Sequence, residues 1–293
     1  RRFIQSAGPF TLGSGAVNNV TVGAVWAPAN QGEGPWSAVE NLKVADDIAQ
    51  ALFDNKFKIL NGPDAPTMGI QEMSNSLILS LENEESSNNF EERYSEVDPL
   101  IVSPPGQNYD SLYHFQGYQV YQLKNRTVSN SELDDVSKAR LVWQSDFEDE
   151  ADKLINHIYD QSIGFDFPEI KVDGNNTGIE HSVQLTTDLF AAGDNRLINH
   201  VEYYYMVIAY AYNNYKSYSQ GGTGQKFPYK VGRRNIKVYS AIPHDPSVEQ
   251  SGTEFLGQYG MSPEIKQVSG RGNGGRFVSL SNQTIGEIFG NIN

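Results

Sequence analysis

The spacing of apolar and polar residues changes along the chain, and its first part has helical periodicity. Between Ser37 and about Asp54, apolar residues recur at steps of three and four, which predicts one amphipathic helix. Ser37 and Glu40 have the spacing of a capping box and indicate that the helix begins at Ser37. Ahead of it, Phe10–Leu12 and Val20–Trp26 predict a strand-turn-strand unit.

These elements are too few to enclose a core of their own. We therefore interpret residues 1–61 as the C-terminal part of a preceding α+β domain, and the whole chain as part of a longer protein. Residues 244–293 are rich in glycine turns and contain a candidate strand at Arg276–Leu280, so we expect either the start of a further small β module or a tail there.

Between these flanks, residues 62–243 have the period of two that is typical of strands. The clearest candidate strands are Leu77–Leu81, Phe115–Leu123, Ala139–Trp143, Tyr203–Tyr212 and Asn235–Tyr239, with weaker signals around Val172 and at Val183–Leu185. Tyr203–Tyr212 is apolar or aromatic on both faces, so we expect a central strand with a partner on each side. The fold class predicted from this pattern is mainly β.

Three segments resemble bacterial fibronectin type III-like domains: Pro63-x-Ala65-Pro66, Phe115-x-Gly117-Tyr118-x-Val120-Tyr121 and Glu202-Tyr203-Tyr204-Tyr205-x-Val207-x-Ala209-Tyr210. The resemblance implies an immunoglobulin-like β-sandwich over residues 62–243. Because such a domain has about 100 residues, it also implies long insertions. Leu197 stands six residues before Tyr203. In the family this spacing implies a tyrosine corner, in which the hydroxyl of Tyr203 would bond to nearby loop backbone.

The flanking segments resemble those of large proteins that Bacteroidota-type bacteria export through a type IX secretion system. The similar segments are Gly8–Leu12, Leu52–Asn55, Leu60–Pro66 and Ile242–Pro246. This resemblance implies an extracellular or cell-surface location and no agreed molecular function. Asp110-Ser111-Leu112 resembles the O-glycan acceptor tripeptide of such bacteria, which makes Ser111 a candidate O-glycosylation site.

Composition narrows the classes of partner. With 22 basic and 36 acidic residues, the net charge of −14 repels nucleic-acid phosphate and anionic membrane, so we expect neither as a partner. No apolar run of about 18 residues is present, and we expect no membrane insertion. The chain has no cysteine, which excludes disulfides, thiolate zinc sites and cysteine nucleophiles.

The candidate chemical motifs favour structure over catalysis. The acidic residues at 146, 148, 149, 150 and 152 predict a solvated face, with a calcium site as the alternative there and at Asp173–Gly178. The five histidines lack the spacing of a zinc helix, and the glycine-rich segments lack the βαβ context of a phosphate loop. We therefore expect no cofactor and no enzymatic activity.

The function predicted from the sequence is that of a non-catalytic structural or adhesive module of an exported surface protein. Its expected partners are other domains of its own longer chain, cell-surface or envelope proteins, and glycans. The alternatives are a carbohydrate-binding accessory module of a secreted enzyme, a subunit of an outer-surface assembly, and a hydrolase with convergent acids. Tyr212, Tyr215 and Tyr218 are the candidate residues for stacking on a ligand.

Overall fold

The computed structural model of the chain describes residues 8–17, 22–29, 34–54, 59–101, 103–104, 106–149, 151–160, 165–174, 176–219, 224–249, 252, 257–261 and 281–284. The chain divides into two compact units, Arg1–Pro246 and Ser247–Asn293. The described residues of the second unit include a short helical turn at 282–284. The candidate strand Arg276–Leu280 lies outside the described residues.

The first unit contains one α-helix, two short 3-10 helices and eleven strands in its described residues. The helices are α1 (Trp36–Asp54), η1 (Phe90–Glu92) and η2 (Asn130–Glu132). The strands are β1 (Thr67–Met73), β2 (Ser76–Glu82), β3 (Ser95–Val97), β4 (Leu112–Leu123), β5 (Ala139–Asp146), β6 (Lys153–Asp160), β7 (Phe165–Asp173), β8 (Ser182–Leu185), β9 (Tyr203–Tyr212), β10 (Tyr229–Val231) and β11 (Val238–Ala241).

The N-terminal segment agrees with the sequence in its helix and differs from it in its strands. α1 confirms the predicted helix, although it begins at Trp36, and the Ser37 hydroxyl donates to the Gly34 carbonyl at 2.9 Å. The predicted strand Phe10–Leu12 is wrong, because residues 8–17 contain a turn and no strand. The described part of Val20–Trp26, residues 22–26, is also not a strand. Alternation alone does not make a strand where no partner supplies hydrogen bonds.

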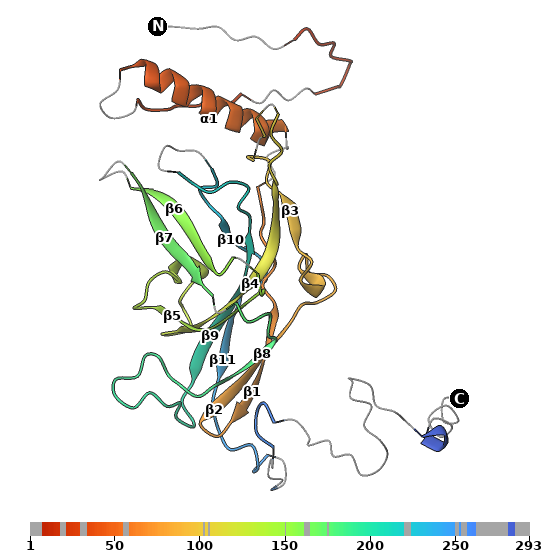
Figure 1. Cartoon of the computed structure of the whole chain (residues 1–293), viewed down its shortest axis with the longest axis vertical. Helices are drawn as coiled ribbons and strands as arrows, with labels where there is room; N and C mark the ends of the chain where they lie inside the picture. Colours follow the sequence, from red (N-terminus) through yellow and green to blue (C-terminus); the bar gives the residue numbers. More distant parts are fainter. Residues whose placement is uncertain are drawn as a thin grey trace. The chain divides into compact units, whose positions relative to one another are not determined.

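The strands form two main sheets and a separate hairpin, and every pairing among them is antiparallel (Figure 1). One sheet has three strands in the order β1-β2-β8. The other has six, in the order β10-β9-β4-β3, with β11 also paired to β9 and β5 also paired to β4. The hairpin consists of β6 and β7 and lies beside β10. The His157 amide of β6 donates to the carbonyl of Lys226, three residues before β10, at 2.8 Å.

β9 is the centre of the larger sheet, as its apolar faces predicted. It pairs with β4 along one edge and with β10 and β11 along the other. Eight of its ten residues are buried. The predicted strands at Leu77–Leu81, Phe115–Leu123 and Ala139–Trp143 are confirmed as β2, β4 and β5. Both faces of a strand can be apolar only where both are covered, and β9 meets that condition.

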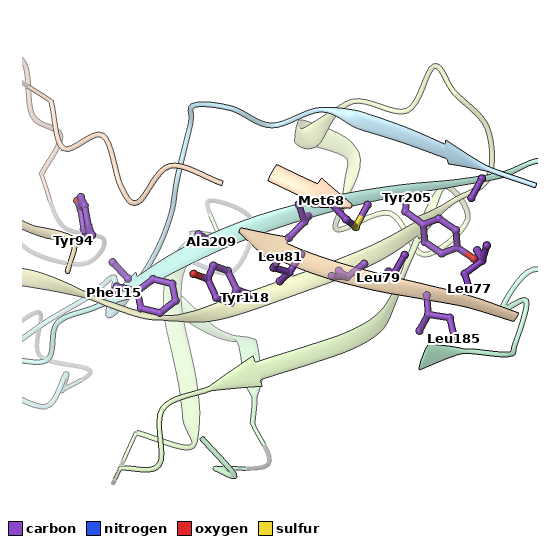
Figure 2. Packing of buried hydrophobic residues seen from close by; sticks show 14 of the residues in the cluster. Met68, Leu77, Leu79, Leu81, Tyr94, Phe115, Tyr118, Leu185, Tyr205 and Ala209 are labelled. Atoms are coloured by element: carbon purple, nitrogen blue, oxygen red, sulfur yellow. The ribbon is translucent and has the colours of Figure 1, made fainter. Parts of the chain in front are cut away.

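The two main sheets contribute side chains to one shared apolar core, and the first unit is mainly β. Figure 2 shows Leu77, Leu79 and Leu81 of β2 among the core side chains, together with Tyr118 and Tyr205 from the larger sheet. Burying each of these large side chains stabilises the fold by about 1.5–3 kcal/mol. The leucines alternate along β2, which is the pattern that predicted the strand.

The weaker strand signals around Val172 and at Val183–Leu185 are confirmed as β7 and β8. The sequence did not predict four of the strands, which are β1, β3, β6 and β10. In β6 the exposed residues Ile158 and Tyr159 are adjacent rather than alternating, and Pro168 interrupts the alternation of β7, so the periodicity of this hairpin is weak. β10 has only three residues. Its pairing with β9 fixes β10, and a local pattern does not reveal that pairing. None of the helices described in the structure is both long and apolar enough to cross a membrane.

Candidate binding groove

A groove of about 440 Å³ lies where the start of β4 meets the end of β9. Its volume is within the range of small-ligand sites, roughly 300–1,000 Å³. It is lined by Asp110, Leu112, His114, Phe115, Gln116, Phe147, Asp149, Tyr212, Asn213, Asn214 and Tyr215. Two of the three tyrosines proposed from the sequence for ligand stacking, Tyr212 and Tyr215, therefore lie in one groove.

Pairing between β4 and β9 brings the aromatic lining together. His114 and Tyr212 are cross-strand partners, so their side chains are neighbours on one face of the sheet. The Tyr215 ring lies 4.7 Å from the ring of Tyr109, and both are half-buried. These contacts hold flat, partly exposed rings at the groove, which is what stacking on a ligand requires.

Tyr218 lies outside the groove lining and contacts the hairpin β6–β7. Its ring lies 4.2 Å from that of His157, and its hydroxyl donates to Asp166. Burial and this hydrogen bond raise the pKa of Tyr218 to about 12. The structure therefore gives Tyr218 a contact with the hairpin and separates it from Tyr212 and Tyr215.

Asn213 connects the two loops that form the groove, and it is 4% exposed. Its amide nitrogen donates to the backbone carbonyls of Asp110 at 2.9 Å and Leu112 at 2.7 Å. Its side-chain oxygen accepts from the Tyr215 amide at 3.2 Å and from Gln225 at 3.1 Å. Sequence reasoning missed Asn213; the only signal was a polar residue directly after the apolar strand.

A second layer of buried hydrogen bonds supports Asn213. Gln225 donates to the Tyr113 hydroxyl at 2.9 Å, and that hydroxyl donates to the Phe227 carbonyl at 2.6 Å. Burial raises the pKa of Tyr113, so the phenol stays protonated and keeps donating. A buried network in which each member has a partner holds one arrangement of the groove walls before any ligand binds.

The charged groups of the groove are carboxylates, and no lysine or arginine belongs to its described lining. The Asp149 oxygens accept hydrogen bonds from Gln116 at 2.9 Å and from the Ala151 amide at 2.7 Å. One oxygen of Asp110 accepts from the Leu112 amide at 2.9 Å. The groove therefore combines aromatic rings with hydrogen-bond acceptors and carries negative charge.

The acidic cluster beside the groove differs from the predicted solvated face at one residue. Asp146 is 1% exposed, and within the described structure its Oδ2 atom has no hydrogen-bond partner. Burial and the charges of Asp149 and Asp152 raise its pKa, against a hydrogen bond from the Asn176 amide. A side-chain carbon at Gly174 would lie 1.8 Å from Oδ2, so glycine is required there. The other described members, at 148, 149 and 152, are exposed.

Calcium was the alternative for this cluster and for the loop Asp173–Gly178. Asn176 connects the two segments, because its side chain accepts from the Asp149 amide at 2.7 Å. Among the described residues, no group of three histidine or acidic side chains is arranged to hold a metal ion. Calcium binding therefore stays a prediction, and the geometry of the described residues does not support it.

The remaining two residues singled out from the sequence lie at the starts of β4 and β9. Ser111 directly precedes β4, is half-buried, and stands between two residues of the groove lining. Tyr203 is the first residue of β9, and its hydroxyl accepts a hydrogen bond from the Ile198 amide at 3.0 Å. Leu197, beside it, is completely buried.

Comparisons with known proteins do not assign the chain to a family. No family model matches it, and no solved structure matches it. A segment of 96 residues is 28% identical to the eukaryotic translation initiation factor 4E transporter of Drosophila melanogaster. That match covers 32% of this chain and 10% of the fly protein. A similarity of this extent supports no inference about family or function.

Proposed function

We propose that the chain is a non-catalytic structural or adhesive module of an exported bacterial surface protein, built on a fibronectin type III-like sandwich. The observation that carries the proposal is the membership of the two sheets. If β1, β2, β4, β8, β9 and β11 are taken as strands A, B, C, E, F and G, then A, B and E form one sheet and C, F and G the other. This is the division found in immunoglobulin-like sandwiches.

The position of Tyr203 supports the same assignment. A tyrosine corner has a tyrosine near the start of strand F, with its hydroxyl bonded to backbone a few residues upstream. Tyr203 opens β9 and bonds to Ile198, five residues upstream. On this assignment the hairpin β6–β7 is an insertion between the strands taken as C and E, which agrees with the insertions expected from the length of the region.

The preorganised groove between the strands taken as C and F favours an adhesive module over one that only holds neighbouring domains apart. Partners of such a module would be other domains of its own longer chain, envelope proteins or glycans. A second candidate function, a carbohydrate-binding accessory module, is favoured by one specific observation, the placement of Tyr212 and Tyr215 in the same groove.

The test is binding of the full chain to intact bacteria of the native host, combined with antibody labelling of non-permeabilised cells. We expect surface labelling and saturable binding to the envelope, with no hydrolysis of glycan, ester or peptide substrates. Detection of the protein only inside cells would contradict the proposal, and so would substrate turnover that the Tyr212→Ala or Asp149→Asn variant abolishes.

A further inference from the structure

We propose that the groove binds an uncharged saccharide and rejects saccharides that carry carboxylate or sulfate groups. This inference rests on the adhesive function proposed above and names the ligand class of the same site. It follows from three features of the groove, which are its aromatic lining, its charge and the rigidity of its walls.

The aromatic lining matches the apolar face of a sugar ring. Tyr212 is the last residue of β9, Tyr215 follows it after two residues, and Phe147, directly after β5, belongs to the same lining. Phe147 is edge-on to Phe115, with 5.6 Å between the ring centroids. Partly exposed rings in the lining of a groove can pack against the C–H groups of a pyranose and keep their polar atoms in water.

The charge of the groove decides which saccharides fit. Asp110 and Asp149 are exposed, and the described lining contains no lysine or arginine that could neutralise an acidic sugar. A carboxylate or sulfate on the ligand would lie near these aspartates and be repelled, whereas a hydroxyl group can donate to them. The side chains of Asn214 and His114, both exposed at the groove, offer further polar contacts to hydroxyl groups.

The rigidity of the walls makes recognition by few contacts effective. Asn213 joins the backbone at Asp110 and Leu112 to the backbone of Tyr215, so the two walls are held together before a ligand arrives. Sugar ligands make weak individual contacts, and a site that needs no reordering loses less free energy on binding.

The test is isothermal titration of the full chain with three kinds of probe. The probes are neutral cello-, manno- and galacto-oligosaccharides, oligogalacturonate as an acidic saccharide, and choline as a cation that an acidic aromatic site could also hold. We expect at least one neutral oligosaccharide to bind, with no binding of oligogalacturonate or choline.

Variants locate the binding. Loss of an aromatic anchor at the centre of an interface lowers affinity by about tenfold or more, so Tyr215→Ala is expected to weaken neutral-sugar binding by that factor. Tyr218→Ala is the matched control, because Tyr218 lies outside the groove lining, and its affinity should equal that of the wild type. The double variant Asp110→Asn, Asp149→Asn should bind oligogalacturonate, which the wild type rejects. Unchanged melting temperatures verify that each variant folds.

Binding of oligogalacturonate to the wild type with equal affinity would overturn the charge argument. Binding of choline alone, or sugar binding that Tyr215→Ala leaves unchanged, would overturn the assignment of the groove. Envelope binding without affinity for any saccharide would overturn this inference and leave the adhesive function standing. If the chain bound neither a saccharide nor the cell envelope, the adhesive function would be overturned as well.

Discussion

Asn156 of β6 bonds to both backbone groups of Tyr229 in β10. Its amide nitrogen donates to the Tyr229 carbonyl at 3.1 Å, and its side-chain oxygen accepts from the Tyr229 amide at 3.0 Å. A side-chain amide thus satisfies edge groups that another strand would otherwise pair with. This contact ties the hairpin to the larger sheet and covers part of an edge that could support aggregation.

Replacing Asn156 should therefore loosen the hairpin. We expect Asn156→Ala to lower the free energy of unfolding by about 2 kcal/mol, because it leaves two backbone groups without partners. Asn156→Asp is the matched variant: it can still accept from the Tyr229 amide, but it places a buried carboxylate against the Tyr229 carbonyl, so its loss at neutral pH should be at least as large. Urea unfolding measures the free energy of unfolding of each variant, and hydrogen exchange measures how well the Tyr229 amide is protected. Equal stability of all three proteins would contradict this role.

The hydroxyl of Tyr203 should contribute measurably to stability. Tyr203→Phe removes the acceptor of the Ile198 amide and is expected to cost about 1 kcal/mol. Tyr204→Phe is the control, because the Tyr204 hydroxyl bonds only to the exposed Glu202 among described residues, and we expect little change. Urea unfolding of both variants makes the comparison. If both variants lost the same amount of unfolding free energy, the hydrogen bond of the tyrosine corner would make no particular contribution to stability.

Asn213 should control the geometry of the groove. Asn213→Ala leaves the carbonyls of Asp110 and Leu112 without their donor, and we expect a loss of roughly 1–3 kcal/mol in the free energy of unfolding. Hydrogen exchange should rise at residues 110–112 and at Tyr215. Asn213→Asp keeps an acceptor for the Tyr215 amide, so exchange at Tyr215 should rise less. Unchanged exchange at both walls would exclude the proposed link.

Asp146 should make stability depend on pH. Because its pKa in the folded state is raised, the folded protein holds a proton that the unfolded chain loses near its ordinary value of about 3.9. Stability attributable to Asp146 is therefore greatest at acid pH and falls as pH rises from there to the raised pKa. We expect Asp146→Asn to flatten this part of the profile and to raise the melting temperature at neutral pH.

Melting temperatures measured between pH 4 and pH 8 test this expectation. Glu85→Gln is the control, because the Glu85 side chain is exposed and its charge is not among those that raise the pKa of Asp146, so this variant should keep the profile of the wild type. If Asp146→Asn lowered the melting temperature at neutral pH, the carboxylate would be ionised and stabilising. That result would contradict the expected direction.

Ser111 remains a predicted O-glycosylation site. Protein purified from the native host should carry added mass on the peptide that contains Asp110-Ser111-Leu112, and Ser111→Ala should remove it. Intact-mass and peptide mass spectrometry measure this, with protein from a host without O-glycosylation as the reference. The absence of added mass on Ser111 in the native host would contradict the prediction.

Local periodicity in the sequence determined the elements that bury a regular apolar face. The helix from Trp36 to Asp54 and the strands β2, β4, β5 and β9 were predictable, because burial imposes a repeat of 3.6 or 2 on their residues. The same argument made β9 a central strand. It failed at Phe10–Leu12, where alternation is present and no pairing strand is described.

Tertiary structure decided what depends on residues far apart in the chain. Pairing of β4 with β9 places Tyr212 beside His114, whereas Tyr218 contacts His157 and Asp166 of the hairpin β6–β7 instead of the groove. Nor could the sequence alone show that Asn213 joins two loops about a hundred residues apart, or that Asp146 is buried while its acidic neighbours are exposed. Such positions are set by register and chain closure, which act over distances that no local pattern records.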